Sequence, residues 1–335
     1  MTTGERRRPK TWSQLGDVRR KVTPYEAVTA KFHYHFRREP APFELDPGMP
    51  LNVWYLEHRE GSPFQVDDWE GYRDPYKLTY KDYVALQHDR EIYLDGLVDR
   101  YEAADAAVEL DAGWVDTLRQ LFIPLRFPLH VLQMVSLYVA QMAPSSFITN
   151  PACFQAGDEM RRIQRIAYWT KVLANAHGES LAATETARDP WVGAPAWQRL
   201  RETLEKLLIA YDWGEGFAAL NLTIKPAIDA LLDLQFAELA ERNGDQFLAL
   251  LFAEFQQDGT RSRDWSQALV AYALEQRPEL RRVLSGWVGR WKPRTHAAVE
   301  ALAPLFETAP VPMKAGDVAA AVRSHHDDFL GACGL

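Results

Sequence analysis

The sequence predicts an all-α protein with an extended N-terminal arm. From about residue 81 onward, apolar residues recur at intervals of three and four, which places them on one face of an α-helix. Sustained strand-like alternation is absent, and Leu51, Val53 and Tyr55 offer at most one short extended piece. Prolines crowd the first 80 residues and prevent long helices there. We therefore predict one domain, made of an arm over residues 1–80 and a helical bundle over residues 81–335.

Composition and charge indicate a soluble globular protein. The 335 residues are 47% hydrophobic and 25% charged, which is enough apolar material for a substantial core. The net charge of −8 argues against a nucleic-acid partner, which a basic surplus would favour. The longest stretch without a formal charge, residues 127–157, is broken by proline and polar residues, and the N-terminus has no apolar leader segment. We expect a cytoplasmic protein that does not bind a membrane.

The arm is rich in proline and in large aromatic residues. The aromatics are too many for a disordered segment, and apolar side chains on an extended arm need a surface to lie on. That surface is either this chain's own bundle or another subunit, and the sequence slightly favours the chain's own bundle. The prolines that crowd the arm are residues 24, 40, 42, 47, 50, 63 and 75, and one more stands at residue 9.

Residues 127–142 are apolar on nearly every side, which predicts a helix at the centre of the bundle. Residues 143–146, Ala-Pro-Ser-Ser, break this helix, and the next one is expected to begin near residues 150–151. Residues 243–245, Asn-Gly-Asp, mark a turn between two later helices. The clearest amphipathic stripes follow at residues 204–211, 247–255, 265–272, 284–291 and 298–305.

The helix that follows residue 150 carries a metal motif without its histidine. A carboxylate-bridged diiron helix uses Glu-x-x-His, because residues i and i+3 share one helix face. Here Glu159 occupies the glutamate position and Arg162 the histidine position. Arginine stays protonated and offers no lone pair to a metal. Taken alone, the pair is more simply explained as an exposed i, i+3 ion pair.

Several separate blocks, in the same order along the chain, resemble the β subunit of toluene-type multicomponent monooxygenase hydroxylases. Together they span most of the chain, which makes the resemblance far more specific than any single block. The blocks are Lys-Thr-Trp-Ser at 10–13, Asp-Asp-Trp at 67–69, Arg-Asp-Pro at 73–75, Leu-x-Tyr-x-x-Tyr at 78–83, Ala-Pro-Ser-Ser at 143–146, Thr-Asn at 149–150, Ala-Tyr at 167–168, Asp-Trp-Gly-Glu at 212–215, Asn-Leu at 221–222 and Lys-Pro at 225–226.

The resemblance implies a ferritin-like, ribonucleotide reductase-like helical bundle within a soluble bacterial α2β2γ2 complex. Only the α subunit of such a complex contains the two irons, where one atom of O2 is inserted into an aromatic hydrocarbon or an alkene. An effector protein, a reductase that uses NADH and often a Rieske ferredoxin complete the system. This chain is then expected to have no cofactor of its own and to be inactive alone.

Alignment by the resemblance places degenerate ligand positions on four expected helices. Leucines stand at the first position and at the last, and Arg162 replaces a histidine, so at least three positions cannot ligate a metal. With the resemblance, we favour a buried Glu159–Arg162 pair that fills a lost metal site. The positions are Leu137 on the first helix, Glu159 and Arg162 on the second, Glu215 on the third, and Asp229 and Leu232 on the fourth.

The predicted role is architectural: the chain dimerises with α through paired helical faces and its arm. Aromatic and arginine anchors dominate such interfaces. The candidates are Trp54, Tyr55, Trp69, Arg73, Tyr80 and Tyr83.

Two other functions are alternatives to this architectural role. The first is a self-sufficient ferritin-like metalloenzyme with Glu159, Glu215 and Asp229 as its carboxylates, and the second is a helical scaffold unrelated to oxygenases. Two histidine groups also invite a metal interpretation. Residues 33–35, His-Tyr-His, are better explained as polar contacts of the arm, and residues 325–328, His-His-Asp-Asp, as a solvated helix end.

Overall fold

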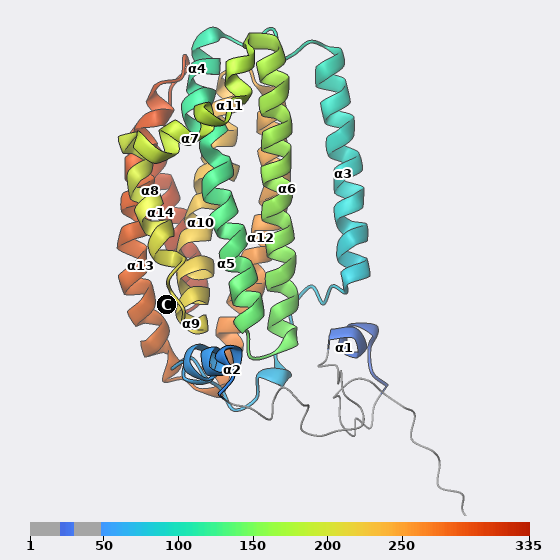
Figure 1. Ribbon diagram of the computed structural model, residues 1–335, viewed down its shortest axis with the longest axis vertical. Helices are drawn as coiled ribbons and strands as arrows, with labels where there is room; N and C mark the ends of the chain where they lie inside the picture. The colour runs from blue at the N-terminus through green and yellow to red at the C-terminus, as the bar shows by residue number, and fades with distance from the viewer. Residues whose placement is uncertain (1–20, 30–47) are drawn as a thin grey trace, which may run out of the picture.

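The computed structural model describes residues 21–29 and 48–335, and this part of the chain is all-α, as predicted (Figure 1). Four helical rods form the central bundle. The first two are α5 and α6, the third is continuous from α9 to α11, and the fourth is α12. Their bounds are α5, Arg126–Met142; α6, Ser146–His177; α9 to α11, Trp213–Arg242; and α12, Gln246–Gln276.

Helices α5 and α6 form an antiparallel hairpin. Ser145 begins α6, because its side-chain oxygen accepts a hydrogen bond from the Phe147 N–H at 3.2 Å. The helix therefore starts about four residues earlier than predicted, and Pro151 lies within it. Helix α5 was predicted to be buried on every side, and that is wrong: one face is buried, while Met134 and Leu137 on the other face are exposed.

The third rod changes helical type along its length. Two stretches have the wider π-helical turn, η6 (Ala218–Ile224) and η7 (Ala230–Phe236), and the short helix α10 (Lys225–Asp229) lies between them. Such π segments are frequent at functional sites. The rod ends at the predicted turn, where Gly244 has a φ of 78° and Asp245 then caps α12. A single rod therefore contains both the segment around Glu215 and the segment around Asp229.

Helix α3 (Tyr80–Ala103) runs along α6 and α12 as a separate column (Figure 1). A capping box of Thr79 and Asp82 begins it. Only Leu94 and Val98 of α3 are buried. Its attachment to the bundle therefore depends on polar contacts, which are described below.

Further helices cover the remaining faces of the bundle. α4 (Ala112–Leu121) and η4 (Ile123–Leu125) lead into α5, and this helical stretch, Ala112–Met142, is long and apolar enough to span a membrane. Most of its apolar window is buried inside the bundle, which accounts for its composition. The remaining elements are η5 (Glu179–Ala182), α7 (Thr184–Gly193), α8 (Pro195–Leu207), α13 (Leu280–Leu302), η8 (Ala303–Glu307) and α14 (Ala315–Ala332).

The described part of the arm packs on the chain's own bundle. Phe64, Trp69 and Tyr72 are buried, and the Tyr72 hydroxyl donates to the Trp265 carbonyl at 3.0 Å. The arm contains α1 (Pro24–Thr29), α2 (Pro50–Tyr55), the π-helical η2 (Leu56–Glu60) and the 3₁₀ turn η3 (Trp69–Gly71).

The prediction of a short extended piece at Leu51, Val53 and Tyr55 is wrong, because all three residues are helical in α2. Pro50 stands at the first position of this helix, where its missing N–H costs nothing. Residues 10–13 and 33–35 lie outside the described residues.

Candidate functional site: two ionic clusters in the bundle

Five charged side chains meet in the middle of the bundle and form what we call the core ion cluster. None is more than 3% exposed, although residues of these types are seldom fully buried unless they are paired. Their spacing explains the meeting: three positions on the third rod follow at i, i+4 and i+8, and two on α6 at i and i+3. The members are Glu159 and Arg162 on α6, Lys225 and Asp229 on α10, and Asp233 on η7.

Two cations and three carboxyl groups are interleaved in this cluster. The Arg162 guanidinium donates to Asp229 Oδ1 and to Asp233 Oδ1, each at 2.8 Å, and Nη1 lies 3.4 Å from both Glu159 oxygens. The Lys225 ammonium contacts Glu159 Oε1 and lies 3.0 Å from Asp229 Oδ2. Glu159 and Asp229 therefore each contact both cations, whereas Asp233 contacts Arg162.

The cluster balances its own charge at neutral pH. Burial by itself would lower the pKa values of Arg162 and Lys225, but the adjacent carboxylates outweigh burial and raise both. Burial would likewise raise the pKa of Asp229, yet Lys225 and Arg162 bring it below its usual value. At Asp233 burial prevails over Arg162 and raises the pKa to about 8. Asp233 then keeps its proton, so two cations face two carboxylates.

Three polar atoms of the cluster lack a hydrogen-bond partner among the described residues, namely Asp229 Oδ2, Asp233 Oδ2 and Arg162 Nε, although Asp229 Oδ2 lies 3.0 Å from the Lys225 ammonium. Helix α12 approaches this side with a glycine. A Cβ added at Gly259 would lie 3.1 Å from Asp229 Oδ2 and 3.4 Å from Asp233 Oδ2. The fourth rod thus passes close to the carboxyl groups with a glycine, while the Arg263 guanidinium of the same helix lies 3.5 Å from that added Cβ and helps to lower the pKa of Asp229.

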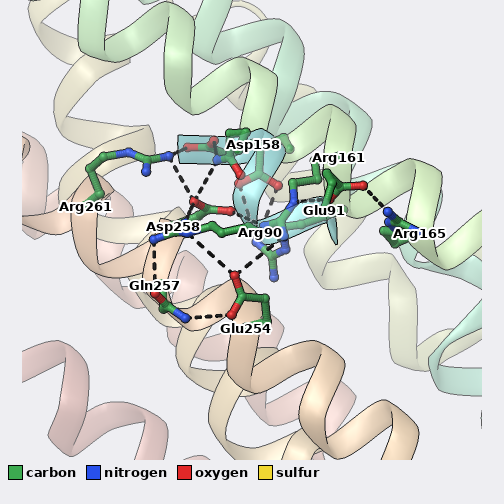
Figure 2. A network of polar contacts seen from close by, with 12 residues as sticks. Arg90, Glu91, Asp158, Arg161, Arg165, Glu254, Gln257, Asp258 and Arg261 are labelled. Carbon is green, nitrogen blue, oxygen red and sulfur yellow. Dashed lines mark hydrogen bonds and ion pairs between the residues drawn. The ribbon is translucent and has the colours of Figure 1, made fainter. Parts of the chain in front are cut away.

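A second group, the outer ion cluster, joins α3 to α6 and α12 (Figure 2). Its centre is Asp258, which accepts from Arg161 at 2.7 Å, from Arg261 at 3.0 Å and from Arg90. Arg161 also donates to Glu91 on α3 at 2.5 Å. The members are Arg90 and Glu91 on α3, Asp158, Arg161 and Arg165 on α6, and Glu254, Gln257, Asp258 and Arg261 on α12.

Asp158 couples the outer cluster to Tyr83. Its carboxylate accepts from the Tyr83 hydroxyl at 3.0 Å and from Arg261 at 2.6 Å. Burial and the nearby charge of Asp258 raise the pKa of Asp158 to about 6, while Arg261 partly opposes them. This network attaches a helix that has few buried apolar contacts of its own.

The structure brings together only some of the positions that the resemblance aligned with ligands. Glu159, Arg162 and Asp229 meet in the core ion cluster. Leu137 does not, because its side chain is 44% exposed on the outer face of α5. Glu215 lies at one end of the third rod, where it accepts from Arg290 at 2.8 Å and from the Trp291 indole at 2.9 Å.

The alignment of Asp229 and Leu232 with a fourth helix is also wrong. Both residues belong to the third rod, and the fourth rod is α12, which the alignment did not use. Leu232 is buried. Lys225 and Asp233 were not predicted as members of this site, although the sequence contains their signal: three charged residues at intervals of four, Lys225, Asp229 and Asp233, in an otherwise apolar helix.

Three of the interface candidates have partners within the chain. Trp69 is buried in the chain's own core. The Arg73 guanidinium lies 3.8 Å from the centre of the Phe147 ring and pairs with Glu26 at 3.4 Å. Tyr83 stacks on Phe154 with ring centres 4.3 Å apart.

The other three candidates reach the surface. Tyr80 is 74% exposed, whereas Trp54 and Tyr55 are partly buried. The Trp54 indole donates to the Tyr138 hydroxyl at 3.1 Å, and Arg59 lies over the Tyr55 ring at 4.5 Å.

The prediction that residues 325–328 form a solvated helix end is wrong for His326. Helix α14 continues to Ala332, so His326 lies within it and is fully buried. Its Nε2 lies 2.8 Å from the Leu222 carbonyl of η6, and its Nδ1 lies 3.1 Å from His296 Nε2. Burial lowers the pKa of His326 to about 4, which keeps the ring neutral.

The core ion cluster does not have the chemistry of a diiron centre. Such a centre needs carboxylates and histidines that offer lone pairs, whereas a guanidinium and an ammonium here occupy the space among the carboxyl groups. Within residues 21–29 and 48–335, no three His, Cys, Asp or Glu side chains are arranged to hold a metal ion. The fold and the cluster together define a ferritin-like helical subunit whose core contains an ionic cluster in place of metal ligands.

Comparison with known proteins identifies the family. The pattern of the Methane/Phenol/Alkene Hydroxylase family matches residues 54–277, more than half of the chain. The chain is 38% identical, over 87% of its length and 89% of the relative's, to the β subunit of the hydroxylase component of the toluene-4-monooxygenase system from Ectopseudomonas mendocina. It is 27% identical, over 85% of its length and 80% of the relative's, to phenol 2-monooxygenase oxygenase component DmpL from Pseudomonas sp. strain CF600.

Solved structures agree with this assignment. A structure of toluene 4-monooxygenase with toluene bound in its resting active site covers 90% of this chain and 99% of its own, with a TM-score of 0.82 and 36% identity. A xenon-pressurised phenol hydroxylase from Pseudomonas sp. OX1 shares the fold, with a TM-score of 0.79 over 94% of this chain and 92% of its own, at 18% identity. The chain belongs to the Methane/Phenol/Alkene Hydroxylase family, as a β subunit of a multicomponent monooxygenase hydroxylase.

Proposed function

We propose that this chain is the non-catalytic, architectural β subunit of a soluble cytoplasmic hydroxylase that inserts one oxygen atom of O2 into an aromatic hydrocarbon or an alkene. The observation that carries the proposal is the core ion cluster, in which Arg162 and Lys225 occupy the space where ligands would be needed. The substrate class comes from the toluene and phenol monooxygenase relatives. The diiron centre of the complex then belongs to the α subunit, and a reductase supplies electrons from NADH.

An uncharged outer surface supports a large partner. After Arg126, α5 contains no charged residue, and both Met134 and Leu137 on its outer face are exposed. On the neighbouring helix α6, Met160 and Tyr168 are exposed as well. Several exposed apolar residues on two packed helices favour a protein–protein contact. We assign this surface, the α5/α6 face, to the paired helical contact with α.

Helix α2 of the arm extends the α5/α6 face. Trp54 on α2 donates to the Tyr138 hydroxyl on α5, which in turn donates to the Tyr211 carbonyl at 2.6 Å. This chain of contacts places α2 beside α5. Leu51, Val53 and Leu56 then expose further apolar surface there. The interface candidates that fit this contact best are Trp54 and Tyr55, together with exposed Tyr80 on α3.

The wider assembly follows from the same assignment. We infer an α2β2γ2 hydroxylase with α and γ subunits, served by an effector protein, a Rieske ferredoxin and the reductase. Glu215 pairs with Arg290, away from Glu159 and Asp229, which argues against the alternative of a self-sufficient metalloenzyme that uses these three carboxylates. An unrelated scaffold is incompatible with the family match.

Co-purification and metal analysis test the proposal. This chain is expressed with and without the larger partner encoded beside it, and iron is measured in each preparation. We expect iron only where the partner co-purifies, and about two irons per isolated chain would overturn the proposal. Met134→Asp with Leu137→Asp should abolish co-purification, whereas Val311→Asp, at an exposed turn before α14, should leave it unchanged.

A further inference from the structure

We propose that Arg162 and Lys225 are two built-in cations that stand in for a dinuclear metal centre and keep divalent metal ions out of this chain. The missing histidine is then only half of the barrier to metal binding, and Lys225 is the other half. This inference concerns the core of the chain itself and does not depend on which partner or substrate the complex has.

The arrangement of contacts is that of a dinuclear centre. Two carboxylates, Glu159 and Asp229, each contact both cations, and a third carboxyl, Asp233, contacts Arg162 alone at 2.8 Å. Carboxylates from facing helices bind a metal pair in the same way, bridging both ions or binding one. The three carboxyl groups come from two rods, whereas a ferritin-like dinuclear metal site takes ligands from all four.

Charge and chemistry make these cations permanent. Arginine does not release its proton, and the carboxylates around Lys225 raise the pKa of its ammonium despite burial. The cluster is already neutral when Asp233 is protonated, so a divalent ion would add an uncompensated charge in a desolvated place. Because both cations are covalently attached, a metal ion cannot displace them.

The cluster also contains a carboxyl oxygen that could ligate a metal ion. Asp233 Oδ2 has no hydrogen-bond partner among the described residues, and Gly259 of α12 places no side chain of its own between the carboxyl groups and the Arg263 guanidinium. Removal of both cations would leave three buried carboxyl groups with Arg263 as a remaining counter-charge. A divalent ion then competes with protons to neutralise them.

The experiment compares four full-length chains: the wild type, Arg162→His, Lys225→Met and the Arg162→His/Lys225→Met double variant. Each is titrated with Co2+ and followed by calorimetry and by visible absorption of the bound ion. We expect no Co2+ in the core of the wild type or of Arg162→His, although the latter restores Glu-x-x-His. The double variant should bind about one Co2+ per chain and should gain thermal stability from it. Adding Glu159→Gln to the double variant should weaken its binding at least tenfold.

Three results would overturn the proposal. Binding of Co2+ by Arg162→His alone, as tightly as by the double variant, would make the missing histidine the whole barrier. A folded double variant that takes up no Co2+ would show that the carboxyl groups do not form a latent site. If the double variant does not fold, the wild type still decides: a Co2+- or Mn2+-dependent rise in its melting temperature that Glu159→Gln abolishes would mean that the cations do not exclude metal.

Discussion

Lys225 on α10 and Glu159 on α6 form an ion pair that is shielded from solvent at both ends. The pair crosses between two rods of the bundle, and Arg162 and Asp229 close the rest of the ring. Buried charges of this kind are costly to desolvate, so the ring is stable only while it is complete. The core of this subunit therefore depends on electrostatic balance among these side chains.

Breaking the ring should strongly destabilise the fold. Arg162→Met retains much of the side-chain volume but leaves Asp229, Asp233 and Glu159 with one cation among them. We expect a loss of about 3–5 kcal/mol in the free energy of unfolding, measured by urea denaturation, because each remaining buried charge is left undercompensated. Arg242→Met removes an exposed i, i+4 pair with Glu238 and should change stability by less than about 0.5 kcal/mol. Equal effects of the two substitutions would contradict this account.

The protonation of Asp233 should appear as a pH dependence. Its pKa lies near 8 in the folded chain and near 3.8 when exposed, so the folded state binds the extra proton between these values. Stability is then lost as pH rises from about 4 to 8 and levels off above that range. Asp233→Asn removes this loss. The difference in urea midpoint between the variant and the wild type should therefore grow in favour of the variant from pH 5 to pH 7.5, and a constant difference would refute the assignment.

Helix α3 should loosen when the outer ion cluster is broken. Asp258→Asn deprives Arg90, Arg161 and Arg261 of a shared carboxylate, and α3 has only two buried apolar residues to keep it in place. We expect faster amide hydrogen exchange throughout α3, with α13 unchanged, because local opening follows the weakest attachment. Asp189→Asn, which removes an exposed partner of Arg188, is the control and should leave α3 unaffected. Unchanged exchange in α3 would show that its attachment lies elsewhere.

The sequence predicted the features that depend on local interactions and failed for those that depend on contacts between helices. Helical periodicity is local, so the all-α class, the α5–α6 break and the turn before α12 could be recognised directly. Register across helices is not local. Residues 213–242 form one continuous rod with two π segments, whereas the alignment by the resemblance placed Glu215 and Asp229 on separate helices and so assigned Asp229 to the wrong helix. Lys225 was overlooked because only the assembled bundle places its ammonium against Glu159.

The exposure of α5 shows a second limit. An apolar helix face is consistent both with the centre of a bundle and with a contact between subunits, and hydrophobicity alone does not separate them. Leu137 was placed at a ligand position because residues 137–140 resemble the family's first metal helix, whereas it lies on the outer face. The packing of the arm was easier to predict, since aromatic residues such as Phe64 and Tyr72 bury most favourably on the nearest apolar surface.

Glycine at position 214 should be required for the arm to pack. Gly214 lies in α9, and a Cβ there would come within 2.6 Å of the Phe64 Cβ and 3.0 Å of Ser62 Oγ, both in the arm. Gly214→Ala should therefore push the arm off the bundle and lower the free energy of unfolding by about 1–3 kcal/mol, as overpacking does. Gly289, in the exposed interior of α13, has nothing within 4 Å of its added Cβ.

Gly289→Ala should accordingly stabilise the chain by about 0.5–1 kcal/mol, because alanine loses less backbone entropy in a helix. Opposite signs for the two substitutions in thermal or urea unfolding would identify close approach of the arm as the reason for Gly214. A stabilising Gly214→Ala would mean that the arm does not rest on α9 in solution. Limited proteolysis between residues 60 and 75 gives an independent readout, since Gly214→Ala should accelerate cleavage there and Gly289→Ala should not.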